Sequence, residues 1–154
     1  MKSSRSWIVV GAILAALSVV LGAFAAHGLE GRLGTLYANE VRQIAGFEVP
    51  ASFKYARDFT TAATYQMYHA LGLILLGLVA GREPRRSHWL AAWCFVLGIA
   101  LFSGSLYMLV LTGQRWLGAI TPFGGMLMIL GWVLFALAAL AKTDASEAEE
   151  QETD

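Results

Sequence analysis

The sequence predicts an all-α protein, a polytopic bundle of four transmembrane helices with a short interfacial loop between the first two. Four stretches contain no Asp, Glu, Lys or Arg: residues 7–29, 59–81, 87–114 and 116–141. A hydrocarbon core about 30 Å thick is crossed by roughly 20 apolar residues, so each stretch is long enough to span a bilayer. The composition agrees, because only 14% of the residues are charged, against about 25% in soluble proteins.

One membrane domain, residues 1–142, accounts for most of the chain. We expect its spans at about 7–29, 59–81, 87–112 and 116–141. We expect no separate soluble domain beside these spans within the 154 residues. Residues 143–154 are rich in acidic side chains. Such a segment buries little apolar surface, so it is predicted to be a disordered acidic tail.

The first span has a second interpretation, a signal peptide that is removed. Lys2 and Arg5 form a basic start, and the Ala-Phe-Ala run at 23–25 resembles a cleavage site. The apolar stretch continues to Leu29, however, which is longer than the usual apolar part of a signal peptide. We therefore expect the first span to be retained.

The distribution of Lys and Arg predicts the orientation. Four spans place the N-terminus, the loop at 82–86 and the C-terminus on one side of the membrane. That side carries six Lys and Arg residues and the other side carries five. Three of the six crowd into the short loop, where the positive-inside rule is strongest. Both termini are therefore predicted to be cytoplasmic.

The segment from Glu30 to Asp58 is the longest stretch between two predicted spans. Its apolar residues recur at spacings of three and four, which is typical of a short amphipathic helix in the interface; they are Leu33, Leu36, Tyr37, Val41 and Ile44. Gly46 is expected to end this helix. Pro50 is expected to open a second helical piece that leads into the second span. The loop either covers the helix ends or contacts a partner or ligand.

Small residues indicate where the helices pack against each other. In the first span they follow one another from Gly11 to Ala26 at spacings of 4, 3, 4 and 4. This pattern keeps them on one helix face, where another backbone can approach closely. The third and fourth spans have similar patterns. The predicted packing positions are Gly11, Gly22, Gly98, Gly118 and Gly125.

Polar side chains inside the spans form a predicted polar layer. At 1.5 Å per residue from the cytoplasmic boundary, His69 lies roughly 18 Å deep, and the other members lie at about 21 to 24 Å. The layer consists of Tyr65, Gln66, His69, Ser103, Ser105 and Thr121. Each group needs a hydrogen-bond partner, because an unpaired polar group in a water-poor layer costs on the order of a few kcal/mol.

His69 is expected to be neutral and to face the interior of the bundle. Its predicted partners are Ser103, Ser105, Thr121 and the carbonyl of Gly118, which Pro122 leaves without a helical donor. The layer is either a set of hydrogen bonds that fixes which helix faces which, or a small polar pocket or relay open to the outer face.

A metal or haem site is not expected. His27, at the outer end of the first span, lies near 30 Å on the same count, about 12 Å from the level of His69. Two histidines with this offset could not clamp one haem unless the helices shift. No metal ligand, cofactor or catalytic residue is predicted.

Four blocks of residues carry a family resemblance. They read GAFAAHGL at 22–29, YQMYHA at 65–70, LFSGSLY at 101–107 and LGAITPFGG at 117–125. The blocks resemble the signature of the domain of unknown function 423 family, also catalogued as uncharacterised protein family 0382. This family has bacterial inner-membrane members and mitochondrial relatives. The resemblance implies a multi-pass protein of the bacterial plasma (inner) membrane with no established activity. The segment from about Gly34 to Tyr55 looks longer than the first loop usual in the family.

Two classes of function follow from these observations. The favoured one is a non-catalytic accessory or scaffold protein that packs against itself or a larger membrane complex. The alternative is a small-solute transporter or channel that acts as an oligomer, with His69 in its polar layer. A coupled transporter normally needs an ionisable residue in the membrane, and the spans contain no carboxylate.

An enzyme is not expected, because no acid, base and nucleophile have a recognisable spacing. The expected partners are the lipid bilayer and either further copies of the chain or a larger membrane complex. Nucleic acid is not an expected partner.

Overall fold

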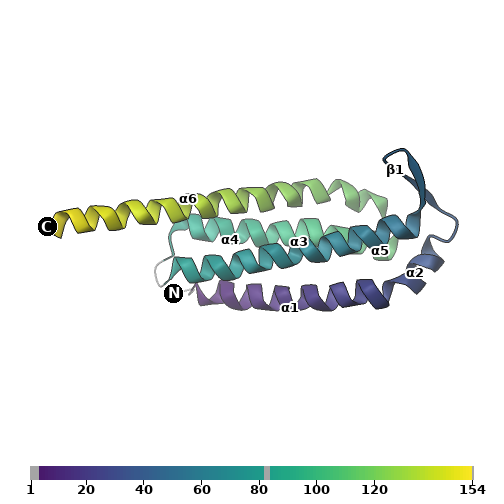
Figure 1. Ribbon diagram of the computed structural model, residues 1–154, viewed down its shortest axis with the longest axis horizontal. Coiled ribbons are helices and arrows are strands. Elements are labelled where there is room, and N and C mark those ends of the chain that lie inside the picture. Colours follow the sequence, from purple (N-terminus) through teal and green to yellow (C-terminus); the bar gives the residue numbers. More distant parts are fainter. Residues whose placement is uncertain (1–3, 82–83, 154) are drawn as a thin grey trace.

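The computed structural model describes residues 4–81 and 84–153, with the side chains of the last helix described up to residue 140. Four helical runs are long and apolar enough to cross a membrane: Arg5–His27, Ala51–Ala80, Arg86–Thr112 and Arg115–Leu140. They lie side by side along one axis and alternate in direction (Figure 1). The prediction of a four-helix membrane bundle is confirmed, with one two-stranded hairpin added to it.

The first two spans, α1 (Arg5–His27) and α3 (Ala51–Ala80), form an extensive antiparallel pair. Gly11 permits their close approach, because a Cβ at this position would lie 2.7 Å from the carbonyl oxygen of Ala70. α3 begins well before the predicted start of the second span at Phe59. Its first two turns are amphipathic, and Tyr55 and Phe59 are buried there against the loop.

The third span is not a uniform α-helix. It consists of α4 (Arg86–Ile99), a π-helical turn η1 (Ala100–Gly104) and α5 (Ser105–Thr112). A π-turn admits one extra residue and shifts the faces of the helix that follows. α4 and η1 both pack along the fourth span.

The fourth span consists of a 3₁₀ turn, η2 (Arg115–Ala119), and the long helix α6 (Thr121–Thr153). Pro122 therefore lies in the first turn of α6 and not inside a continuous helix, as the sequence analysis assumed. A first turn accommodates proline without losing an internal hydrogen bond. The assumption that Pro122 frees the carbonyl of Gly118 within a helix is wrong for this reason.

The acidic end of the chain also differs from the prediction. α6 continues to Thr153, and Figure 1 shows it extending beyond the other helices, whereas residues 143–154 were expected to be disordered. Residues 145–151 are Ala, Glu and Gln apart from Ser146. These residues have high helix propensity, which explains a helix in spite of the negative charge. Asp154 lies outside the described residues.

The loop between the first two spans contains a short helix and a hairpin. Helix α2 (Leu29–Leu36) is followed by strands β1 (Val41–Ile44) and β2 (Phe47–Pro50), which pair in antiparallel register. Ala45 and Gly46 form the turn with φ angles of +51° and +86°, as a type I′ turn requires. The predicted helix is therefore wrong beyond Leu36. β-branched and aromatic residues beside a tight turn favour strands, although their spacing also fits a helix.

The two ends of the bundle are held in different ways. At one end, the hydroxyl of Ser4 donates a hydrogen bond to the carbonyl of Gly81, so the start of α1 lies beside the end of α3. At the opposite end, α2 and the hairpin lie near α5 (Figure 1). This arrangement agrees with the expected grouping of the N-terminus and the loop at 82–86, of which residues 82 and 83 lie outside the described part.

Candidate functional site

Gln66 is the centre of the polar contacts between the helices. Its side chain is 2% exposed, and its Nε2 donates to the backbone carbonyl of Leu14 on α1 at 2.8 Å. Its Oε1 accepts a hydrogen bond from the hydroxyl of Tyr107 on α5 at 3.1 Å. One amide thus connects α1, α3 and α5. Such side-chain bonds between helices help to fix their packing in a membrane.

Hydroxyl groups make further bonds between the helices. Ser103 donates to the carbonyl of Ala62 at 2.8 Å, and this bond joins η1 to α3. The hydroxyls of Ser105 and Thr121 lie 2.9 Å apart, joining α5 to α6. The polar layer therefore consists of separate contacts rather than one connected network.

His69 is buried, with 5% of its surface exposed, but its predicted partners are wrong. Its Nδ1 lies 2.7 Å from the backbone carbonyl of Tyr65, on the same helix. Ser105 and Thr121 bond to each other and Ser103 bonds to Ala62, so these hydroxyls do not bond to His69. A carbonyl can only accept a hydrogen bond, so Nδ1 carries the proton. In the neutral ring, Nε2 then keeps a lone pair that can accept one.

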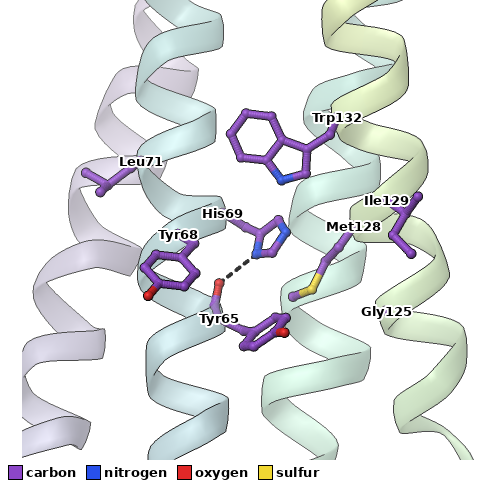
Figure 2. A pocket seen from close by; sticks show the side chains of 8 residues that line it. All are labelled: Tyr65, Tyr68, His69, Leu71, Gly125, Met128, Ile129 and Trp132. Carbon is purple, nitrogen blue, oxygen red and sulfur yellow. Dashed lines mark hydrogen bonds between the residues drawn. The ribbon is translucent and has the colours of Figure 1, made fainter.

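A cavity of about 630 Å³ lies beside His69, between α3 and α6. Its lining residues are Tyr65, Tyr68, His69, Leu71, Gly125, Met128, Ile129 and Trp132. Figure 2 shows the imidazole of His69 and the indole of Trp132 on neighbouring walls of this space, with Tyr65 and Met128 farther along it. The ring centroids of His69 and Trp132 are 6.0 Å apart. Tyr68 and Ile129 are largely exposed, so the cavity opens on the lipid-facing side of the bundle.

Of the predicted packing glycines, Gly11 and Gly98 lie against neighbouring backbones. A Cβ at Gly98 would lie 3.2 Å from the carbonyl oxygen of Gly124. Gly118 and Gly125 meet side chains only. A Cβ at Gly118 would lie 3.3 Å from Leu109, and one at Gly125 would lie 3.7 Å from Phe102.

Gly22 does not pack against another helix, so its predicted role inside the bundle is wrong. No atom of another described segment lies within 4 Å of the position that its Cβ would take. Gly11 and Ser18 lie on the face of α1 that meets α3, where Ser18 donates to the carbonyl of Ala63 at 2.8 Å. At about 100° per residue, Gly22 lies about 20° around the helix from Gly11, so it shares that face of α1, but no neighbouring helix of the described chain approaches it closely there.

The four sequence blocks that carry the family resemblance all lie within one family-model match. Residues 21–125 match the family model described as Protein of unknown function (DUF423). This chain belongs to that family. The match includes Gln66, His69 and Tyr107, whereas Gly11 and Trp132 lie outside it.

Relatives named UPF0382 membrane proteins match nearly the whole chain. One from Staphylococcus epidermidis is 45% identical over 136 residues, covering 88% of this chain and 96% of the relative. The UPF0382 membrane protein YwdK of Bacillus subtilis is 41% identical over 137 residues, covering 88% of this chain and 97% of the relative. No solved structure matches the chain. The protein is a multi-pass membrane protein of this uncharacterised family.

Two residues that the sequence did not single out take part in these contacts between helices: Tyr107, which bonds to Gln66, and Gly124, which lies against the third span. Tyr107 lies in a leucine-rich run, and the need of a buried phenol for a partner is the signal that could have identified it. At Gly124, a Cβ would lie 2.3 Å from the backbone nitrogen of Phe102. The sequence offered two adjacent glycines there, and only the structure shows which one faces the third span.

His27 is the last residue of α1 and is exposed. Within residues 4–81 and 84–153, no group of three or more His, Cys, Asp or Glu side chains is arranged to hold a metal ion. His27 therefore stays a candidate residue of the outer helix end, separate from His69.

Charged residues join the loop to the start of the fourth span. Glu40 accepts hydrogen bonds from Arg42 at 3.1 Å and from Arg115 at 2.8 Å. Arg42 also donates to the hydroxyl of Tyr55 at 3.1 Å, and this bond raises the pKa of the Arg42 guanidinium. The contacts close the bundle at this end by tying the hairpin to η2 and α3.

Tyr37 connects the loop to the third span. Its hydroxyl donates to the carbonyl of Val110 at 3.1 Å, near the end of α5. Burial raises the pKa of the Tyr37 hydroxyl, with smaller contributions from the charges and phenol around it. This end of the bundle is therefore a packed structural cover over α3 and α5.

Proposed function

We propose that this chain is a non-catalytic accessory or scaffold protein of the bacterial plasma membrane, with both termini cytoplasmic, that acts by packing against another transmembrane helix. The observation that carries the proposal is the open surface at Gly22. This glycine borders a groove of about 270 Å³ between α1 and α3. Small residues on a lipid-facing surface let a further helix backbone approach closely.

The polar groups beside the groove are suited to this role. The hydroxyls of Thr60 and Thr64 each donate, at 3.0 Å, to a carbonyl of their own helix. Ser18 donates across to the carbonyl of Ala63. Because these hydroxyls already have an acceptor, a helix that enters the groove does not need to supply one. The contact would depend on close packing.

The hydrogen bonds of the polar layer join helices to each other, which supports an accessory role over a transporter. Gln66 and Ser103 bond to backbone carbonyls of neighbouring helices, and such contacts hold the bundle together. Transport coupled to ions usually depends on intramembrane ionisable groups that face a water-filled path. His69 bonds to its own helix and faces a cavity that opens toward lipid.

A second copy of the chain is the simplest partner for the groove. Gly22 and Ala26 are four residues apart on α1, a spacing that lets two copies of one helix cross closely. A partner of another sequence would need a similarly small face. Both cases make the protein a lateral packing partner within the bilayer.

Disulfide crosslinking tests the proposal directly. The chain has one cysteine, Cys94, so Cys94→Ala provides a cysteine-free background for Gly22→Cys. We expect oxidation of native membranes to crosslink Gly22→Cys into a dimer of this chain or, where a different partner carries its own cysteine at the contact, to a second membrane protein that mass spectrometry identifies. Val20→Cys is the matched control, because Val20 is 63% exposed and does not line the groove.

Native mass spectrometry provides a second measurement. Gly22→Ile fills the groove, and its Cβ has no atom of another described segment within 4 Å, so the variant should fold as the wild type does but lose the association. Equal crosslinking at both cysteine positions, or a wild-type protein that is monomeric and partner-free in mild detergent and in nanodiscs, would contradict the proposal.

A further inference from the structure

The cavity between α3 and α6 contains a hydrogen-bond acceptor that the bundle does not use. The proton of His69 lies on Nδ1, which bonds to the carbonyl of Tyr65. Nε2 therefore presents its lone pair, and His69 lines the cavity. Among the side chains that the structure describes, none donates a hydrogen bond to this nitrogen. An occupant that donates one would satisfy it.

A hydrogen-bond donor lies on the neighbouring wall. Figure 2 shows the indole nitrogen of Trp132 on the side of its ring that faces His69. An indole N–H can donate but cannot accept, and it makes no side-chain or backbone hydrogen bond within the described part of the chain. The cavity therefore presents one acceptor and one donor within a short distance, since the two ring centroids are 6.0 Å apart.

A hydroxyl group is complementary to this pair. It can donate to Nε2 of His69 while its oxygen accepts from the Trp132 indole. A carbonyl could satisfy only the indole, and an ammonium could satisfy only the imidazole. A hydroxyl on an apolar molecule also avoids the cost of bringing a charge into the membrane.

The remaining walls favour an aromatic ring with an apolar tail. Tyr65, Tyr68 and Trp132 provide aromatic surfaces, and Met128 provides a thioether, which also contacts rings favourably. The volume of about 630 Å³ lies in the range of small-molecule sites, roughly 300 to 1,000 Å³. Because the exposed Ile129 lies on the rim, a tail could continue into the surrounding lipid.

From this geometry we infer that the cavity binds a membrane-soluble phenol, the class that includes quinol head groups. The phenolic hydroxyl bridges His69 and Trp132, the ring lies among the aromatic walls, and the tail extends into the bilayer. This site is distinct from the groove at Gly22 and does not depend on the proposed association there.

Binding of 4-nonylphenol to the protein in lipid nanodiscs tests the inference. The matched probe is 4-nonylanisole, which has the same ring and tail but a methyl ether in place of the hydroxyl. We expect 4-nonylphenol to bind at least tenfold more tightly to the wild type than 4-nonylanisole does, and to raise its unfolding temperature, as a ligand specific for the folded state must.

Two variants locate the site. His69→Phe removes the acceptor and Trp132→Phe removes the donor, and each should weaken 4-nonylphenol binding about tenfold. His69→Phe should leave 4-nonylanisole binding nearly unchanged, because an ether cannot donate to the imidazole. Trp132 is 40% exposed, so its variant tests the site even if His69→Phe does not fold. Leu75→Ala is the control, because Leu75 is an exposed residue of α3 outside the cavity.

Three results would overturn the inference. They are equal affinities of the two probes for the wild type, undiminished phenol binding by folded Trp132→Phe, and no saturable binding of 4-nonylphenol at all. The last result would mean that His69 and Trp132 hold only a water molecule. None of these results bears on crosslinking at Gly22, so the two proposals fail separately.

Discussion

The hydroxyl of Tyr107 donates a hydrogen bond to Oε1 of Gln66 at 3.1 Å, across the interface between α5 and α3. The Nε2 group of the same amide donates to Leu14 on α1. Both ends of the amide are therefore fixed, and its orientation is determined by its two partners. The bond also holds α5 in place after the π-helical turn at Ala100–Gly104 has shifted its faces.

Replacing Gln66 by Leu should destabilise the bundle. The change keeps the side chain similar in size but makes it apolar, and it leaves the Tyr107 hydroxyl without its acceptor. We expect the free energy of unfolding to fall by about 1 to 3 kcal/mol, the usual cost of an unsatisfied buried group. Denaturation of the purified protein in mixed micelles measures this change.

A double-mutant cycle with Tyr107→Phe isolates the bond itself. The coupling energy between the two positions should be about 0.6 kcal/mol, the average for side-chain hydrogen bonds measured in a membrane protein. Purely additive effects of the two substitutions would show that the Gln66 to Tyr107 contact contributes nothing measurable to stability.

The same substitution at two glycines of α1 should affect thermal stability differently. Gly11→Leu places a side chain against the backbone of Ala70, so it should lower the unfolding temperature in detergent by several degrees or prevent folding. Gly22→Leu places its Cβ where no atom of another described segment lies within 4 Å and raises helix propensity, so the unfolding temperature of the monomer should not fall. Equal losses at both positions would place Gly22 inside the bundle after all.

Adjacent glycines of α6 provide a finer comparison. Gly124→Ala puts a methyl group 2.3 Å from the backbone nitrogen of Phe102, whereas Gly125→Ala meets the Phe102 ring at an ordinary 3.7 Å. The first change forces α6 away from η1 and should cost more than about 1 kcal/mol, as overpacking commonly does. The second should be neutral or slightly stabilising. Thermal unfolding of the two variants in the same detergent would distinguish them.

The membrane orientation is testable with reporter fusions. A fusion after Lys142 should report a cytoplasmic location, and an insertion near Gly46 should report an outer one, because three arginines lie in the loop at 82–86 and the positive-inside rule is strongest for short loops. Replacing all three by Gln should weaken or invert this topology. A reversed pattern in the wild type would contradict the prediction of cytoplasmic termini.

The four spans could be predicted from the sequence because their physical cause is local. An uncharged run such as residues 87–114 needs only length and apolar character to cross a bilayer. The hairpin could not be predicted in the same way. Val41 and Ile44 fit a helical spacing as well as a strand, and the choice depended on the φ > 0 turn at Ala45 and Gly46.

The candidate site was predicted in part. Polar groups within apolar spans need partners, and Gln66 and Ser103 do bond to neighbouring helices, whereas Tyr65 is 43% exposed and lies outside a buried layer. The pairing of His69 was not predictable, because the rotation of each helix about its axis decides which groups meet. The same rotation decides that Gly124 rather than Gly125 faces the backbone of Phe102.

The free energy of unfolding should fall at alkaline pH, because Tyr37 in the loop has a raised pKa in the folded state. Burial, the largest cause, raises the pKa of this hydroxyl above 10.0, its ordinary value. The nearby charges act in both directions, because Glu40 and Tyr55 raise the pKa whereas Arg115 and Arg42 lower it. The neutral phenol is therefore the form that the folded state favours.

A raised pKa in the folded state means that the unfolded chain loses this proton first as pH rises. The stability that neutral Tyr37 contributes should be complete below about pH 10, the ordinary tyrosine pKa, and should decline above it until the folded-state pKa is reached. Tyr37→Phe loses the bond to Val110, so it should be less stable at neutral pH by about 1 kcal/mol. Its unfolding free energy should nevertheless fall less steeply than that of the wild type above about pH 10. Parallel curves for the two proteins from about pH 8 to about pH 11, a range that brackets the ordinary tyrosine pKa, would show that Tyr37 is not protected from ionisation by the folded loop.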